Sequence, residues 1–151
     1  MKQLMLLIAI LIPGTPLLSA EPAPEEDYQT LQGKWIRSDQ DSKGSPLRVE
    51  QEISNKISKV SMYDRNRKLL HSHQAKFHLQ RMSDVSLFTY FDLEVLEGPN
   101  KGRKQKTPVT FVYRVKDNRF IQVEGILNGD KIPTRLLTWW KVKIPSLPQD
   151  T

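Results

Sequence analysis

Apolar and polar residues alternate with a period of two along most of this chain, which is the pattern of strands that bury one face. In the first clear segment Val49 and Ile53 alternate with charged neighbours. The same pattern predicts strands over residues 48–53, 58–63, 68–80, 87–96, 109–115, 120–124 and 136–142. In the 87–96 strand it places Phe91 and Leu93 on the buried face and Tyr90 on the opposite face.

Short polar segments separate these strands, at residues 64–67, 97–102, 116–119 and 128–130. Their Gly, Pro, Asn and Asp residues favour tight reversals between antiparallel neighbours. No stretch keeps a helical apolar period for long, and only residues 25–32 fit a short helix. We therefore predict an all-β fold, an up-and-down antiparallel β-barrel of about eight strands, whose closure removes exposed strand edges.

The first twenty residues have the features of a secretory signal peptide. Lys2 supplies a positive charge, and Leu4 to Ile12 form an apolar run that is too short to span a bilayer. Ala20 is the small residue that signal peptidase requires at a cleavage site. We predict cleavage after Ala20, export to the periplasm or the extracellular space, and no transmembrane anchor.

The remaining chain is long enough for one hydrophobic core. Residues 21–30 are acidic and rich in proline, which predicts a flexible spacer. Residues 31–143 are predicted to form the barrel domain, and residues 144–151, with two prolines and little apolar content, a disordered tail.

Composition narrows the chemistry. The chain has no cysteine, which excludes disulfides, thiolate nucleophiles and zinc sites built on cysteine. Its formal net charge is +6 and its pI about 9.6. Between Tyr28 and Lys143 there are 22 basic and 12 acidic side chains, so we expect the surface to attract anions such as a small molecule or an acidic envelope component. No nucleic-acid-binding motif is present, and we expect a monomer that does not bind nucleic acid.

Two motifs carry a family resemblance. Residues 31–35 have the sequence Leu-Gln-Gly-Lys-Trp, and residues 97–103 have the sequence Glu-Gly-Pro-Asn-Lys-Gly-Arg. In this order, behind a signal peptide, they resemble the small secreted lipocalin-like domains that are abundant in planctomycete bacteria. The resemblance implies a lipocalin-like barrel in which Gly33 and Trp35 are structural and Trp35 closes the barrel floor. It implies no biochemical activity.

His71 and His73 form the most suggestive pair of side chains for chemistry. Their i, i+2 spacing places them on one face of a strand, and that face should point into the barrel. Two imidazoles can bind a transition metal, but a site normally needs a third ligand, and His78 lies on the opposite face. We interpret the pair as part of a polar lumen and predict neither a metal nor a cofactor. No catalytic motif occurs, so no catalytic residue is predicted and the protein is not expected to be an enzyme.

Cationic residues gather on two predicted turns, Arg65 and Arg67 on one and Lys101, Arg103 and Lys104 on the other. Two strands separate these turns, so a meander places both at the same end of the barrel. There they would form a cationic rim able to capture an anion.

The adjacent tryptophans of the last strand must face opposite sides, so one is expected in the core and the other half exposed or facing a ligand. Trp139 is the candidate for ligand contact.

The sequence leaves two functions open. One is a carrier of a small amphiphilic or anionic ligand, which needs an open cavity. The other is a non-enzymatic envelope interaction module or a barrel-type peptidase inhibitor, which needs a filled core and an exposed apolar patch.

Overall fold

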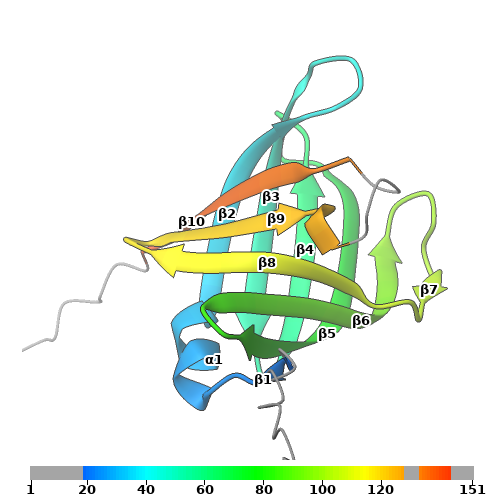
Figure 1. The fold of residues 1–151 in the computed structure, drawn as a ribbon. Coiled ribbons are helices and arrows are strands. Elements are labelled where there is room, and N and C mark those ends of the chain that lie inside the picture. Colours follow the sequence, from blue (N-terminus) through cyan, green and yellow to red (C-terminus); the bar gives the residue numbers. More distant parts are fainter. Residues whose placement is uncertain (1–18, 128–132, 144–151) are drawn as a thin grey trace, which may run out of the picture.

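The structure, a computed structural model, describes residues 19–127 and 133–143, which form a closed antiparallel β-barrel (Figure 1). The wall consists of β2 (Gly33–Gln40), β3 (Pro46–Ser54), β4 (Ile57–Tyr63), β5 (Leu69–Met82), β6 (Val85–Glu97), β8 (Val109–Lys116), β9 (Arg119–Glu124) and β10 (Arg135–Lys141). Each wall strand pairs with the next one along the chain, and β10 returns to β2. Two-residue strands, β1 (Glu21–Pro22) and β7 (Lys104–Gln105), add to β5 and β6. The predicted eight-stranded up-and-down barrel is therefore confirmed.

Alternation along the strands builds the core. In β3 the buried positions are Leu47, Val49, Gln51 and Ile53, and the residues between them are more exposed. Inside the barrel, the rings of Phe77 on β5 and Phe88 on the neighbouring strand β6 stack at a centroid distance of 4.6 Å. The buried cluster comprises Tyr28, Leu31, Trp35, Val49, Ile53, Phe77, Leu79, Phe88, Phe111, Tyr113, Phe120 and Trp139.

For the first half of the 87–96 strand, the prediction of which face points into the core is wrong. Phe88 is fully buried and Tyr90 packs against the core, whereas Phe91 pairs with an exposed lysine on β5. The register between β5 and β6 shifts twice, and each shift inserts an extra residue into β6. One insertion lies at Asp92, whose φ is 52°. Because an extra residue exchanges the two faces of a strand, Phe88 and Tyr90 point inward before the bulge and Val95 points inward after it.

The prediction of a flexible spacer over residues 21–30 is also wrong. Glu21 and Pro22 pair with the end of β5, and the Ala23 amide donates a hydrogen bond of 3.0 Å to the Leu79 carbonyl oxygen. The fold therefore begins at Glu21, ten residues before the expected boundary of the barrel domain.

A short helix, α1 (Glu25–Leu31), lies against the lower end of the barrel in Figure 1. Three acidic residues in its first turn complement the positive end of the helix dipole. One of them, Asp27, forms a two-pronged ion pair with Arg81 of β5 at 2.6 and 2.9 Å. The buried Tyr28 hydroxyl accepts a hydrogen bond of 2.8 Å from the Leu79 amide. These contacts hold the predicted short helix on the barrel.

Trp35 joins this helix to the barrel floor. Its side chain is completely buried, as expected, and its indole N–H donates a 2.8 Å hydrogen bond to the Leu31 carbonyl oxygen at the end of α1. The ring packs on Phe120 at 5.5 Å, and the Lys141 ammonium lies 5.1 Å from its centroid. Gly33 supplies the φ of +111° with which the chain leaves the helix and enters β2.

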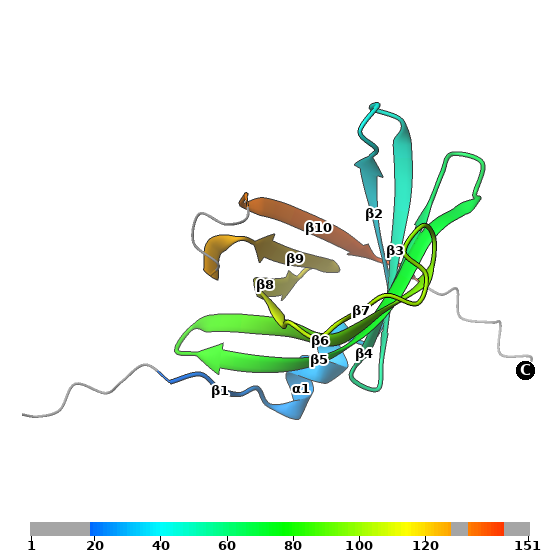
Figure 2. The same cartoon turned by 90° about the vertical axis from the view of Figure 1, so that its right-hand side faces the viewer.

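The seam between β2 and β10 is short. Within the described residues two facing pairs join these strands, the last being Ile36 with Trp140. By contrast, β2 pairs with β3 over eight positions and β10 pairs with β9 over six. A continued ladder would next align Arg37 with Trp139, but from there the strands separate, as Figure 2 shows.

Three predicted segments lie wholly or mostly outside the described residues: the signal peptide up to residue 18, the 128–130 turn and the 144–151 tail. In the part of the chain that is described, no helix has the length and apolar character needed to cross a membrane.

Candidate ligand-binding site

Five polar side chains occupy inward positions on five different strands. They are Arg37, Gln51, Ser58, Tyr90 and Gln122, and we call them the polar layer. The strand register brings them together, because Gln51 faces Trp35 on one side and Val60 on the other, in the middle of the inward rows. They lie above the apolar floor that Trp35 and α1 close.

Hydrogen bonds connect part of the polar layer. The Gln51 amide nitrogen donates to the Ser58 hydroxyl at 3.0 Å and to the Tyr90 hydroxyl at 2.6 Å. The Trp139 indole N–H donates to the Gln122 side-chain oxygen at 2.9 Å. Trp139 is therefore a core residue that orients Gln122, while Trp140 on the outer face is 53 % exposed. The predicted difference between the two tryptophans is confirmed, but Trp139, the candidate for ligand contact, is the core member of the pair.

Four buried atoms of the polar layer have no hydrogen-bond partner among the described residues: Arg37 Nε and Nη1, Gln51 Oε1 and Gln122 Nε2. Exchanging the oxygen and nitrogen of the Gln51 amide would leave the nitrogen unpaired instead, so one atom of this group lacks a partner either way. Buried polar groups in native proteins are almost always paired, and each unpaired one costs about 1–3 kcal/mol. Three donors and one acceptor of the polar layer are thus unpaired, and two of the donors belong to Arg37.

Arg37 carries the charge of the site. Its Nη2 lies 3.1 Å from Asp39 Oδ2, and the same oxygen lies 3.7 Å from Arg135 Nη2, so one carboxylate serves two guanidinium groups. The guanidinium also lies 4.5 Å from the centroid of the Trp139 ring. Burial lowers the pKa of Arg37 below its usual value; Asp39 opposes this shift and Arg135 adds to it. An anion beside Arg37 would stabilise its charged form.

The separation of β2 and β10 gives access to this group. A cleft of about 430 Å³ lies between them, lined by Arg37, Ser38, Asp39, Arg135, Leu136, Leu137 and Thr138. Its size falls in the range of small-molecule sites. Arg37 and Asp39 of β2 and Arg135 of β10 supply charge, and Leu136 and Leu137 of β10 supply apolar surface, a combination that suits an amphiphilic molecule.

The predicted histidine pair lies elsewhere on the inner wall. His71 and His73 face Met62 and Val60 of β4, which pack against the core, and their rings approach to 3.1 Å between Nε2 and Nδ1. Burial and the neighbouring imidazole lower the pKa of His73 to about 4. The described residues contain no group of three or more His, Cys, Asp or Glu side chains that could hold a metal ion.

The cationic turns do not join the polar layer. A β-carbon at Gly98 would lie 2.9 Å from the Leu70 carbonyl oxygen, so the 97–102 turn lies against the strand that follows the 64–67 turn, at one end of the barrel. Lys101 pairs with Glu97 at 2.9 Å, and Lys104 lies 3.9 Å from Glu94. Arg65, Arg67 and Arg103 are exposed. These cations lie at the surface of one end of the barrel, and the cation in the polar layer is Arg37.

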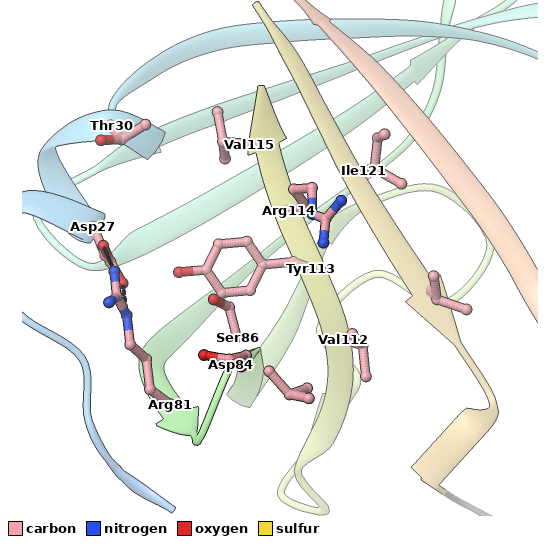
Figure 3. A pocket seen from close by; sticks show the side chains of 12 residues that line it. Asp27, Thr30, Arg81, Asp84, Ser86, Val112, Tyr113, Arg114, Val115 and Ile121 are labelled. Atoms are coloured by element: carbon pink, nitrogen blue, oxygen red, sulfur yellow. Dashed lines mark hydrogen bonds and ion pairs between the residues drawn. The ribbon is translucent and has the colours of Figure 1, made fainter. Parts of the chain in front are cut away.

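A second pocket of about 570 Å³ is lined by residues of α1, the end of β5, β6, β8 and β9 (Figure 3). The Tyr113 ring points toward the Asp27–Arg81 ion pair, which already satisfies both charges. Burial, and then Asp27, raise the pKa of Tyr113 to about 12. Among the described residues, no side chain that lines this pocket carries a buried unpaired polar atom.

Sequence reasoning missed the polar layer, although a signal was present. Gln51 lies between Val49 and Ile53 on an apolar face, and Arg37 follows Trp35 on the same face of β2. Polar residues that interrupt an inward apolar row indicate a polar interior.

No protein-family model, curated protein or solved structure matches this chain. Its function is therefore inferred from geometry and chemistry.

Proposed function

We propose that this chain is an exported, lipocalin-like carrier that binds a small amphiphile with an anionic head in the cleft between β2 and β10. The observation that carries the proposal is that Arg37, which lines this cleft, keeps two buried N–H donors without a partner among the described residues. A barrel filled only for stability would gain nothing from them, since each costs free energy that an apolar side chain would not. A ligand that pairs with them recovers this free energy on binding.

The chemistry of the free groups defines the ligand. Arg37 lines the cleft and offers two N–H donors there, whereas Gln51 and Gln122 hold the other unpaired atoms and are not among the lining residues. Because Asp39 is shared between two arginines, the site favours a negatively charged group rich in acceptors, such as a carboxylate or a sulfonate. Leu136 and Leu137 would contact the apolar part. In this proposal the protein binds and releases its ligand and has no catalytic residue.

The alternative of an interaction module or peptidase inhibitor has one observation in its favour. Leu136 and Trp140 are 68 % and 53 % exposed on the outer surface. A protein that acts only through its surface does not need a polar layer with unpaired interior donors, so we place the carrier first.

A pair of dyes tests the carrier function. The anionic amphiphile 8-anilinonaphthalene-1-sulfonate should bind the wild-type protein, and Arg37→Met should weaken it at least tenfold, because hydrogen bonds to a charged donor are worth about 1.5–3 kcal/mol. The affinity for the neutral analogue N-phenyl-1-naphthylamine should change less than twofold on the same substitution. Arg48→Met, on the exposed outer side of β3, is the matched control. Equal affinity of the sulfonate for wild type and Arg37→Met would refute the proposal. If the sulfonate binds as expected, native mass spectrometry of protein purified from its own cells would identify the natural ligand.

A further inference from the structure

The outer surface of β8, β9 and β10 carries apolar side chains where a barrel exposed to water should carry polar ones. The outward row across these strands runs from Val112 to Val123 to Leu136, which face one another in register. Ile121 and Trp140 lie in the next two outward rows toward the closed end of the barrel, where Ile121 faces Arg114 and Thr138, and Trp140 faces Arg119. In Figure 3, Val112 and Ile121 lie on the side of the sheet away from the inward-pointing Tyr113. We call this surface the β8–β10 face.

The opposite outer surface shows that this pattern is not general. On β3, β4 and β5 the outward residues include Glu50, Glu52, Lys59, Ser61, Gln74 and Lys76. The two surfaces belong to the same barrel and contact the same solvent. Contiguous apolar side chains on only one of them mark that face as an interaction site.

Cations border the β8–β10 face. Arg114 faces Ile121 across the β8–β9 ladder, and Lys116 faces Arg119. Among the described residues, no carboxylate lies within 4.0 Å of Arg114 or Lys116. The Arg119 guanidinium lies 5.8 Å from the centroid of the exposed Trp140 ring. The face thus combines branched apolar side chains, an indole at the edge and unneutralised positive charge.

We propose that the β8–β10 face docks on the surface of an anionic lipid bilayer. Tryptophan and basic residues beside an apolar surface are the combination that lies at the interface between headgroups and acyl chains. The positive charge complements anionic headgroups. A protein partner would have to supply both an apolar patch and acidic groups spaced to match Arg114 and Lys116, whereas an anionic bilayer supplies both over its whole surface.

Docking in this orientation would also serve the carrier function. Leu136 belongs to the β8–β10 face and also lines the cleft beside Arg37. Thr138, two residues further along β10, lines the cleft as well. A docked barrel would therefore present the opening between β2 and β10 to the bilayer. The docking itself does not depend on the proposed ligand, because it is measured without one.

Vesicle flotation tests the docking, with the purified protein as its own cells process it. Vesicles of phosphatidylcholine with about 30 % of the anionic lipid phosphatidylglycerol should carry the protein upward, and pure phosphatidylcholine vesicles should carry far less. The double variant Arg114→Glu/Lys116→Glu should weaken partitioning by at least about 25-fold, since each cation near an anionic surface contributes about fivefold. Leu136→Ser/Trp140→Ser should weaken it by at least about tenfold through the lost apolar contact.

Three matched controls define the face. Lys59→Glu/Lys76→Glu makes the same change of charge on the opposite outer surface, Ile57→Ser removes an exposed apolar side chain there, and Arg65→Glu/Arg67→Glu reverses the cationic turn. Each should change partitioning less than threefold. Equal binding to neutral and anionic vesicles, an equal loss in any control, or concentration-dependent dimers that Leu136→Ser/Trp140→Ser abolishes would overturn the proposal. The dye assay reports on the cleft alone, so either proposal can fail while the other stands.

Discussion

Replacing Trp35 with alanine should nearly exhaust the stability of the barrel. The side chain is fully buried, and substitution of such an aromatic residue by alanine costs about 3–5 kcal/mol through lost burial and the cavity left behind. The indole also donates to the Leu31 carbonyl oxygen at 2.8 Å, a partner that the alanine variant cannot replace. The total is comparable with the 5–15 kcal/mol by which domains of this kind are stable. The floor between α1 and β2 therefore depends on one side chain.

Urea denaturation followed by far-ultraviolet circular dichroism measures this loss without relying on tryptophan fluorescence. For an m-value near 2 kcal/mol/M, the midpoint should fall by about 2 M. Trp35→Phe keeps most of the apolar contact with Phe120 and removes the donor, so it should cost only about 1–2 kcal/mol. Trp140→Ala, at a half-exposed position on the outer face, should shift the free energy of unfolding by less than about 1 kcal/mol. Equal losses for Trp35→Ala and Trp140→Ala would refute the assignment of the barrel floor.

Three further predictions concern other contacts. Tyr28→Phe leaves the buried Leu79 amide without its acceptor and should cost about 1–3 kcal/mol in the same urea titration, while Tyr63→Phe, whose hydroxyl makes no such contact, should cost little. Burial, and then the adjacent imidazole, depress the pKa of His73 to about 4, so the unfolded chain takes up this proton at a higher pH than the folded protein. The contribution of neutral His73 to the free energy of unfolding is therefore present above pH 6.5, and it should fall by about 3 kcal/mol as the pH drops to 4. That pH dependence should be absent from His73→Gln, and its persistence there would assign it to other groups. Gly98→Ala should destabilise by about 1–3 kcal/mol, since its φ is +107° and the new β-carbon would contact a backbone oxygen at 2.9 Å; a neutral effect would contradict the close approach of the 97–102 turn to Leu70.

The period-two pattern predicted most strands and the barrel, because inward and outward positions alternate from one end to the other of β3, β8 and β9. It failed at β6, where the bulge at Asp92 exchanges the faces. A bulge depends on how the partner strand continues, which one strand's own residues do not encode. The alternation there was real, but its phase changed partway along.

The N-terminal segment was misjudged for a different reason. Its acidic and proline-rich composition is typical of a spacer, yet single residues within it bind specific partners on β5. Tyr28 supplies a hydroxyl acceptor for a buried amide, and Asp27 neutralises Arg81. Composition averages over such residues, so it cannot predict contacts that depend on one side chain reaching one atom. The polar layer was missed similarly, since its members come from five strands and meet only when the barrel closes.

Three departures from the rules of a stable barrel lie along one line of the wall. The β2–β10 ladder stops after two facing pairs, Arg37 keeps two unpaired buried donors directly beyond it, and Leu136 and Trp140 expose apolar surface on the same strand. Each lowers stability or solubility, and none is required by closure, because the other seven seams pair over longer runs. Violations scattered at random would point to a tolerant fold. Violations that converge on a single seam are characteristic of a functional site, where binding recovers what the unbound protein forgoes. The β2–β10 seam is therefore the place where mutation should affect function most at least cost to the fold.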